Sequence, residues 1–171
     1  RKVKLPKDMT PKLFRSHLLS SMSNPNPSDW VGMDKRDKCN SKLISSGILD
    51  RVPVVIGRQP TLHKPSMRAF KAELTDERSL RINPLCVTGF NADFDGDQMW
   101  CRVPVSEGAV EEVKELMSIE QNIYYPKNGE CSVMPRQEII YGLNVCTRAI
   151  LQKGSSMKSY SGYRELFDDL F

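Results

Sequence analysis

The segment from Asp93 to Asp97 places three carboxylates within five residues and constrains the fold more than any other feature. Asp93, Asp95 and Asp97 alternate with Phe94 and Gly96, and no lysine or arginine lies among them to offset their repulsion. A hard divalent cation suits such a cluster, because carboxylate oxygens favour Mg²⁺, Mn²⁺ or Ca²⁺ over zinc or copper. Gly96 has no Cβ, so the backbone can turn sharply there and direct the side chains to one point. The pattern predicts a metal site on a tight loop.

Two other interpretations of the acidic cluster can be weighed from its neighbours. A calcium loop of the EF-hand type needs glycine at its sixth position and glutamate at its twelfth. Counted from Asp93, those positions hold Gln98 and Pro104, so this interpretation fails. A solvated turn rich in Asp and Gly remains the simpler alternative. The large apolar residues Phe94 and Met99, together with strands predicted on either side, favour a built site over a plain surface turn.

Size and composition indicate a globular domain of ordinary length. The chain has 171 residues, of which 39% are hydrophobic and 27% charged. It contains no apolar run of 18 or more residues, so we expect no membrane span and no membrane partner. Its start, Arg1 to Pro6, lacks the apolar core of a signal peptide. Because the sequence does not begin with Met, we expect the natural chain to begin upstream.

The formal charge is unevenly distributed along the chain. The net charge is +4, and residues 1–50 hold ten Lys and Arg against five Asp and Glu. A basic surplus of this kind suits a polyanionic partner such as nucleic acid. A solvated basic face is the alternative, since surpluses of this size are common on protein surfaces.

The cysteines favour a reduced, intracellular protein. There are five, an odd number, and none forms a C-x-x-C pair, which argues against a disulfide framework. The two histidines, His17 and His63, do not lie at ligand spacing from any cysteine, so we expect no zinc site.

Hydrophobic periodicity predicts a mixture of helices and strands. We expect helices at 10–22, 35–46, 106–117 and 136–151, and strands at 52–57, 79–88 and 98–103. Thr10 and Ser106 are candidate N-caps, and Gly47 is a candidate C-terminal residue in the left-handed conformation. Residues 58–65 contain two prolines and should be irregular. The apolar stripe at 163–171 either packs on its own domain or docks on another chain.

Read with its neighbours, the run Asn91–Met99 resembles the active-site motif of the largest subunit of multisubunit, DNA-dependent RNA polymerases (β′ in bacteria). Residues 58–64 are similar to the R-x-P-[ST]-L-H-[RK] segment of that family. RNA-dependent polymerases of the silencing type share only a shorter core. Further matches follow in the family's order and extend the resemblance over about residues 4–150: Leu5–Met9, Leu13-Phe14, Val103-Pro104, the 106–117 helix, Asn122-Ile123, Pro126, Asn128-Gly129 and Pro135-x-Gln137.

The resemblance implies an α+β fold, half of a double-psi β-barrel with flanking helices, within a larger subunit. Residues 1–50 would be a helical, basic lead-in segment. Residues 51–135 would be the catalytic portion of the barrel, with the metal loop and an inserted helix, and residues 136–171 a C-terminal helical segment. The sequence departs from the family at Trp100, where a small residue is usual, and at Arg102, where histidine is usual. The chain would be an excised fragment or one piece of a split subunit, as in some large bacteriophages.

The resemblance also implies nucleotidyl transfer by two metal ions. Asp93, Asp95 and Asp97 would hold one Mg²⁺, and a second would arrive with the nucleoside triphosphate. Partners would be the β-like subunit, the remaining β′-like parts, template DNA, product RNA and nucleoside triphosphates. We expect the chain to be inactive alone, and to work in the cytoplasm of a bacterium or phage-infected host, associated with the nucleoid.

By the same resemblance, further residues receive roles. Arg58 and Asn91 would lie near the ribose of the incoming nucleotide, where an arginine donates and an amide donates or accepts. Gln137 would lie near the active centre. Nucleic-acid backbone contacts are expected from three cations, for which a solvated basic face is the alternative: Lys64, Arg68 and Lys71.

Other functions remain open from the sequence. Arg58 has the alternative of a structural arginine at the barrel rim, and His63 is expected to be structural. The chain could also be a non-catalytic assembly module that retains the barrel, although such a module need not keep three repelling carboxylates. A metal-dependent nuclease is disfavoured because the sequence offers no candidate general base.

Overall fold

The computed structural model describes residues 2–22, 36–136 and 138–148. The chain divides into two compact units, Arg1–Arg136 and Gln137–Phe171. In the second unit, helix α8 (Glu138–Thr147) falls within the predicted helix at 136–151. The apolar stripe predicted at 163–171 lies outside the described residues. The fold and sites below belong to the first unit.

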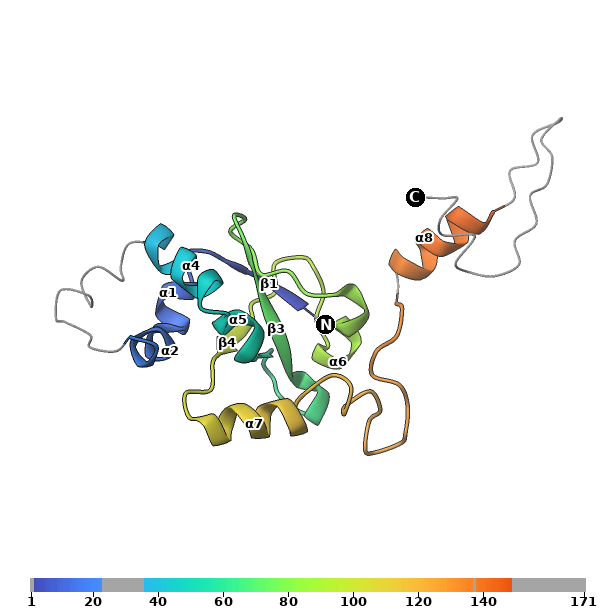
Figure 1. The fold of residues 1–171 in the computed structure, drawn as a ribbon. Coiled ribbons are helices and arrows are strands. Elements are labelled where there is room, and N and C mark those ends of the chain that lie inside the picture. Colours follow the sequence, from blue (N-terminus) through green and yellow to red (C-terminus); the bar gives the residue numbers. More distant parts are fainter. Residues whose placement is uncertain (1, 23–35, 137, 149–171) are drawn as a thin grey trace, which may run out of the picture. The chain divides into compact units, whose positions relative to one another are not determined.

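A four-stranded sheet forms the centre of the first unit (Figure 1). Its strands are β1 (Lys2–Pro6), β2 (Val54–Gly57), β3 (Met67–Thr75) and β4 (Trp100–Arg102), in the order β1-β3-β2-β4. β1 runs parallel to β3, with Lys2 opposite Lys71, whereas β2 is antiparallel to both β3 and β4. The fold is therefore mixed α+β, as the sequence predicts.

The strand predicted at 79–88 is wrong. Within that range Arg81 forms only an isolated bridge with Lys4, after which the chain enters the 3₁₀ helix η2 (Pro84–Cys86) and helix α6 (Val87–Phe90). Asn83 starts this turn, because its Oδ1 accepts a hydrogen bond from the Leu85 N–H at 2.9 Å. Pro84 supplies no N–H to a strand ladder. The strand of this part of the chain lies earlier than predicted, at β3 (Met67–Thr75). The sequence analysis predicted no strand at β1.

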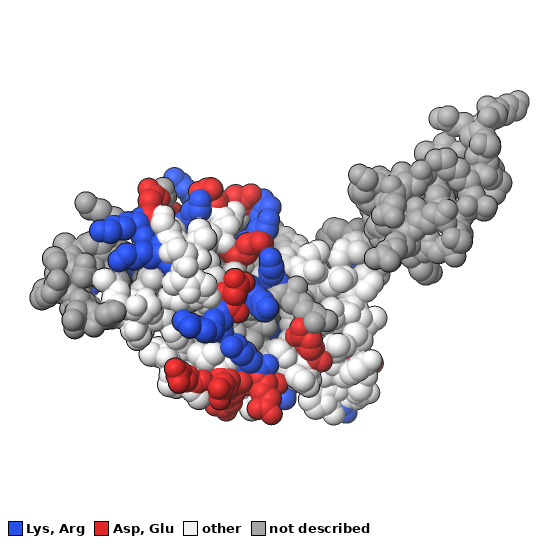
Figure 2. Space-filling model, viewed as in Figure 1, with Lys and Arg blue, Asp and Glu red and all other residues white. Residues whose placement is uncertain are grey.

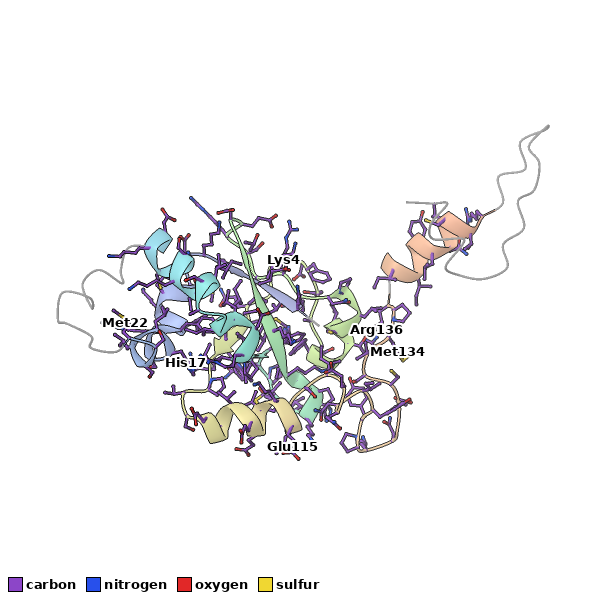
Figure 3. All side chains as sticks on the ribbon, viewed as in Figure 1. Lys4, His17, Met22, Glu115, Met134 and Arg136 are labelled. Atoms are coloured by element: carbon purple, nitrogen blue, oxygen red, sulfur yellow. The ribbon has the colours of Figure 1, made fainter. Side chains whose placement is uncertain are left out.

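The helix predicted at 10–22 is two short helices, α1 (Thr10–Leu13) and α2 (Arg15–Ser20), which meet at Phe14. Thr10 is not an N-cap: it lies inside α1, is fully buried, and its hydroxyl donates to the Lys7 carbonyl at 3.0 Å. His17 on α2 contacts the chain just after β4, with its Nε2 2.6 Å from the Pro104 carbonyl oxygen (Figure 3).

The remaining helices follow the predictions more closely. Helix α4 (Arg36–Ser45) ends before Gly47, whose φ of 64° is the left-handed conformation expected there. A short helix that was not predicted, α5 (Ile48–Arg51), leads into β2. Helix α7 (Glu107–Leu116) begins as predicted, because the Ser106 side chain accepts a hydrogen bond from the Ala109 N–H at 3.3 Å.

One hydrophobic core joins residues that are distant in sequence. Leu5, Phe14 and Leu43 from the predicted lead-in segment are fully buried in the same cluster as Ile56 and Phe90. The described part of the lead-in segment and the predicted barrel portion therefore share one core. No helix in the described ranges is long and apolar enough to cross a membrane. The five cysteines of the chain are all free thiols.

Candidate metal centre

The acidic loop is held between α6 and β4. Helix α6 ends at Phe90, and Asn91 then adopts a left-handed conformation with φ 50° and ψ 44°, which asparagine tolerates better than most residues. The loop continues to Trp100, where β4 pairs with β2. Both ends of the loop are thus fixed, one by a helix packed on the core and the other by the sheet.

The three carboxylates converge. Asp93, Asp95 and Asp97 each offer an oxygen, and these oxygens lie within 4.8 Å of one another. Gly96 has a φ of 126°, a conformation that L side chains rarely adopt, so the turn between the last two aspartates requires glycine. The predicted turn is therefore present, and it brings the three side chains together as expected.

Arg58 binds the last of these aspartates at two points. It follows β2 directly, and its Nε lies 2.7 Å from Asp97 Oδ2 while its Nη2 donates to Oδ1 at 3.0 Å. The Asp93 N–H also donates to Asp97 Oδ2, at 3.0 Å. Asp97 is therefore oriented from both sides, by the end of β2 and by the start of its own loop.

These contacts move two pKa values in opposite directions. The hydrogen bond from Arg58, followed by that from the Asp93 backbone, holds the pKa of Asp97 below its usual range. A hydrogen bond shared with Asp95 raises the pKa of Asp93, and the charges of Asp95 and Asp97 act in the same direction. Crowded carboxylates of this kind gain most from a cation.

The donor set fits magnesium. Within residues 2–22, 36–136 and 138–148, this is the one group of three or more His, Cys, Asp or Glu side chains placed to share a metal ion. It supplies carboxylate oxygens without nitrogen or sulfur, which suits Mg²⁺ rather than zinc. The loop is largely exposed, so a cation held by these carboxylates could take further oxygen ligands from water or substrate.

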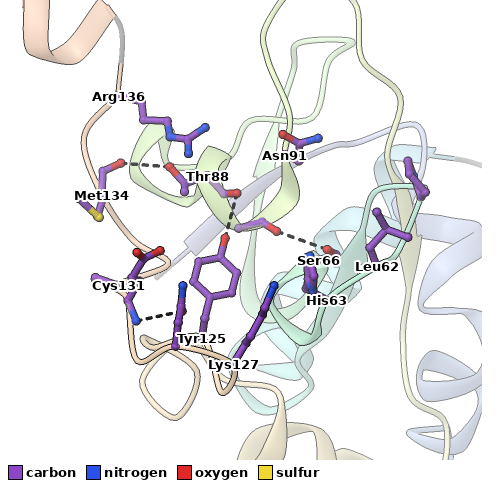
Figure 4. Close-up of a pocket in the computed structure, with 14 residues that line it drawn as sticks. Leu62, His63, Ser66, Thr88, Asn91, Tyr125, Lys127, Cys131, Met134 and Arg136 are labelled. Carbon is purple, nitrogen blue, oxygen red and sulfur yellow. Dashed lines mark hydrogen bonds between the residues drawn. The ribbon is translucent and has the colours of Figure 1, made fainter.

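A pocket of about 860 Å³ opens beside Asn91 (Figure 4). One wall comes from the chain after β2, including His63, and another from α6. The third wall is the segment from Tyr125 to Arg136, which the sequence did not mark as functional. The Tyr125 hydroxyl donates to the Thr88 carbonyl at 3.2 Å, and its ring meets the His63 ring edge-on at 6.3 Å.

Comparison with known proteins places the chain in a family. A family model described as RNA polymerase Rpb1, domain 2 matches residues 22–119. The match covers more than half of the chain and includes Arg58 and the whole acidic loop. The chain belongs to this Rpb1 family.

Three relatives of this Rpb1-family chain are β′ subunits of RNA polymerase. A DNA-directed RNA polymerase subunit beta′ from Sulfurimonas denitrificans is 37% identical over 147 residues, which are 84% of this chain and 10% of that subunit. Subunits of the same name from Burkholderia ambifaria and Burkholderia mallei are each 35% identical over 167 residues, which are 95% of this chain and 12% of theirs. The resemblance to the β′-type subunit is confirmed, and the chain spans about a tenth of the length of these relatives.

The other predicted site residues of the Rpb1-family chain are dispersed. Asn91 lines the pocket beside the acidic loop. Lys64 and Lys71 are exposed, on η1 (Lys64–Ser66) and β3. Figure 2 shows Lys and Arg side chains interspersed with Asp and Glu on the face in view, with acidic side chains along the edge formed by α7. Gln137 lies outside the described residues.

Arg68 corrects the sequence analysis. It is fully buried, so the expected contact with a nucleic-acid backbone is wrong. Its Nε donates to the Pro65 carbonyl at 3.0 Å and its Nη2 to the Ser132 hydroxyl at 2.7 Å. Burial lowers the pKa of Arg68. Burial of Arg68 was not expected, because the strand that carries it into the core, β3, was not predicted.

Gly57, the residue before Arg58, makes a close contact with Trp100. Gly57 faces Trp100 across the β2–β4 pair, and the indole ring covers the glycine so closely that a Cβ would overlap the ring. The unusual Trp100 is therefore accommodated by the absence of a side chain at Gly57.

Proposed function

We propose that this chain is the catalytic-centre portion of a DNA-dependent RNA polymerase and carries the Mg²⁺ site for nucleotidyl transfer to the RNA 3′ end. The observation that carries the proposal is the convergence of Asp93, Asp95 and Asp97 in a chain whose relatives are β′ subunits. The proposed partners are the remaining polymerase subunits, template DNA, product RNA and nucleoside triphosphates. We place the assembly in the cytoplasm, on the nucleoid.

The three aspartates would hold one ion, and the surrounding residues would orient their carboxylates toward it. When bound, Mg²⁺ would supply electrostatic stabilisation at the RNA 3′-hydroxyl and the α-phosphate, with Asp93, Asp95 and Asp97 as its protein ligands, and the triphosphate substrate would bring a second ion. Arg58 orients Asp97 by its two-point contact. No side-chain nucleophile is needed, since positioning and electrostatic stabilisation supply most of the rate in phosphoryl transfer.

Arg58 and Asn91 are the proposed ribose contacts. A guanidinium carries five N–H donors, and the pair with Asp97 engages two of its nitrogens, which leaves donor capacity for a substrate hydroxyl. Asn91 stands where α6 meets the metal loop, at the rim of the pocket, and its amide can donate to or accept from a 2′-hydroxyl. Gln137, Lys64 and Lys71 keep their predicted roles as part of this proposal.

We further propose that the sheet is half of a double-psi β-barrel. In support, the sheet combines one parallel and two antiparallel pairs, and its short strand β4 leaves the metal loop. Strands from elsewhere in the subunit would complete the barrel. Since groups on other chains would contact the triphosphate, the chain alone should not extend RNA.

The test uses the polymerase assembled from all of its subunits. Asp95→Ala should abolish templated extension without changing subunit assembly, because it removes one metal ligand. The matched control is Glu111→Ala, which removes a carboxylate from the exposed face of α7 and should extend RNA as the parent does. Extension by Asp95→Ala within a few-fold of the parent would refute the catalytic role and favour the assembly module.

A further inference from the structure

Arg68 is a fully buried cation whose described hydrogen-bond partners are all neutral. Its side chain has no exposure, and it donates to the Pro65 carbonyl, the Ser132 hydroxyl and, at 3.4 Å, the Ser132 carbonyl, and also bonds the Cys86 thiol, whose pKa is raised by burial. Among the described residues, the Arg68 Nη1 is buried without a hydrogen-bond partner. Burying a guanidinium in this way is costly, and a neutral side chain of similar volume would avoid the cost. The charge therefore calls for an explanation other than fold stability.

The partners of Arg68 belong to three different segments. Pro65 lies in η1, at the end of the irregular stretch that begins with Arg58. Ser132 belongs to the chain beyond α7, and its hydroxyl lies 2.7 Å from the Ile123 carbonyl oxygen. Phe90 of α6 lies with its ring centroid 5.8 Å from the guanidinium carbon. The Arg68 side chain on β3 thus contacts η1, the chain beyond α7 and helix α6, and α6 leads into the metal loop.

Helix α6 packs directly against the Arg68 guanidinium. A Cβ at Gly89 would overlap the Arg68 Nη2 atom, so α6 rests directly on the guanidinium. The Gly89 carbonyl also accepts a hydrogen bond from the Ser66 hydroxyl at 3.4 Å. Asn91 follows α6 at once, and Asp93 two residues later. Any shift of α6 against Arg68 would therefore be passed to the first carboxylate of the cluster.

We propose that Arg68 is a positioning residue for the metal centre, which sets α6, and through it Asn91 and Asp93, at the place where the three carboxylates converge. The inference rests on the proposed function. It assigns Arg68 no contact with substrate or metal. Replacing residues that hold metal ligands in position, without touching the metal, commonly lowers metal affinity or activity by roughly 10–100-fold.

The experiment measures the apparent Mg²⁺ activation constant of RNA extension in the assembled polymerase. Arg68→Met keeps the length of the side chain and removes its charge and donors, so the constant should rise roughly 10-fold or more. Arg68→Lys should recover part of this loss, because an ammonium can still donate to Pro65 and Ser132. Gly89→Ala leaves Arg68 in the chain but pushes it from α6, and should also raise the constant.

A control separates positioning from folding. Leu43→Ala removes a fully buried side chain on α4 and should lower the thermal midpoint without moving the Mg²⁺ constant. If Arg68→Met does not assemble, Arg68→Lys and Gly89→Ala carry the same test. An unchanged Mg²⁺ constant in the assembled Arg68 and Gly89 variants would overturn the inference, whatever their thermal midpoints.

A separate readout covers failure of the proposed function. If the parent assembly does not extend RNA, Mn²⁺ binding followed by electron paramagnetic resonance still compares the variants. Weaker Mn²⁺ binding in Arg68→Met than in Leu43→Ala would support the positioning role without polymerase activity. Equal Mn²⁺ affinities in parent, Arg68→Met and Leu43→Ala would refute it.

Discussion

Replacing Gly57 with alanine should destabilise the chain while Trp100 is present and stabilise it once Trp100 is removed. In the parent, a Cβ at Gly57 would overlap the indole ring across the β2–β4 pair. The ring must then move, and β2 has little freedom because Val54 and Ile56 are fully buried. When Trp100 is alanine the overlap disappears, and the new methyl group only restricts the unfolded chain.

The magnitude follows from these two terms. Overpacking of a tight contact typically costs about 1–3 kcal/mol of the free energy of unfolding. Without the clash, alanine in a strand is favoured over glycine by roughly 0.5–1 kcal/mol. The effect of Gly57→Ala should therefore differ between the two backgrounds by about 2 kcal/mol, within the range measured for residues in contact. Trp100→Ala alone should cost less than the roughly 3–5 kcal/mol of a fully buried aromatic, because the ring is only partly buried.

The assay is urea unfolding of four proteins: the parent, Gly57→Ala, Trp100→Ala and the double variant. Unfolding is followed by far-ultraviolet circular dichroism, since fluorescence changes when Trp100 is removed. Each single variant should lower the free energy of unfolding, and the double variant should lose less than the sum of the two single losses. Equal effects of Gly57→Ala in the two backgrounds would show that the indole does not rest on Gly57, and the explanation of Trp100 would fail.

Three further predictions concern single side chains. Arg58→Ala should raise the pKa of Asp97 toward its usual range, which carboxyl NMR titration measures. In the parent, the lowered pKa adds stability that is present above the unfolded-state pKa and lost as the pH falls through the folded value, so the variant should lose less stability in acid; an unchanged titration of Asp97 would contradict this. Ser106→Ala should cost about 1 kcal/mol in urea unfolding because it removes the N-cap of α7, and Ser106→Asp, which keeps an acceptor, should not. Asn122→Ala should cost roughly 1–3 kcal/mol, because its buried amide donates to the carbonyl of Leu116, the last residue of α7, and to that of Ser118 just beyond it. A loss below about 0.5 kcal/mol, the usual range at exposed surface positions, would count against these contacts.

The features that the sequence predicted correctly are those that local chemistry determines. Gly47 and Gly96 adopt the positive φ angles that a helix end and a tight turn require. Ser106 caps α7 with its own hydroxyl. The acidic loop converges because its spacing and its glycine lie within five residues. Each of these could be predicted from neighbouring residues alone, although Arg58 at the end of β2 further orients Asp97.

The features that the sequence analysis missed depend on distant partners. β3 carries Arg68, Lys71 and Glu73, and its polar composition hid a strand that exists because β1 and β2 pair on either side of it. β1 had a usable pattern, since Lys2 and Lys4 alternate with buried residues, but five residues are too few to decide. The burial of Arg68 could not be predicted without the strand that carries it.

The position of β3 between β1 and β2 also bears on the order in which the protein folds. β1 precedes the other described elements of this unit, yet its parallel partner is β3, which follows only after α1, α2, α4, α5 and β2. The β1–β3 ladder therefore cannot form until β3 has been synthesised, whereas β2 and β3 are near neighbours and can pair early. Closing so long a loop has an entropic cost that slows folding. We expect the β2–β3 pair to form first and the docking of β1, with its buried Val3 and Leu5, to complete the domain.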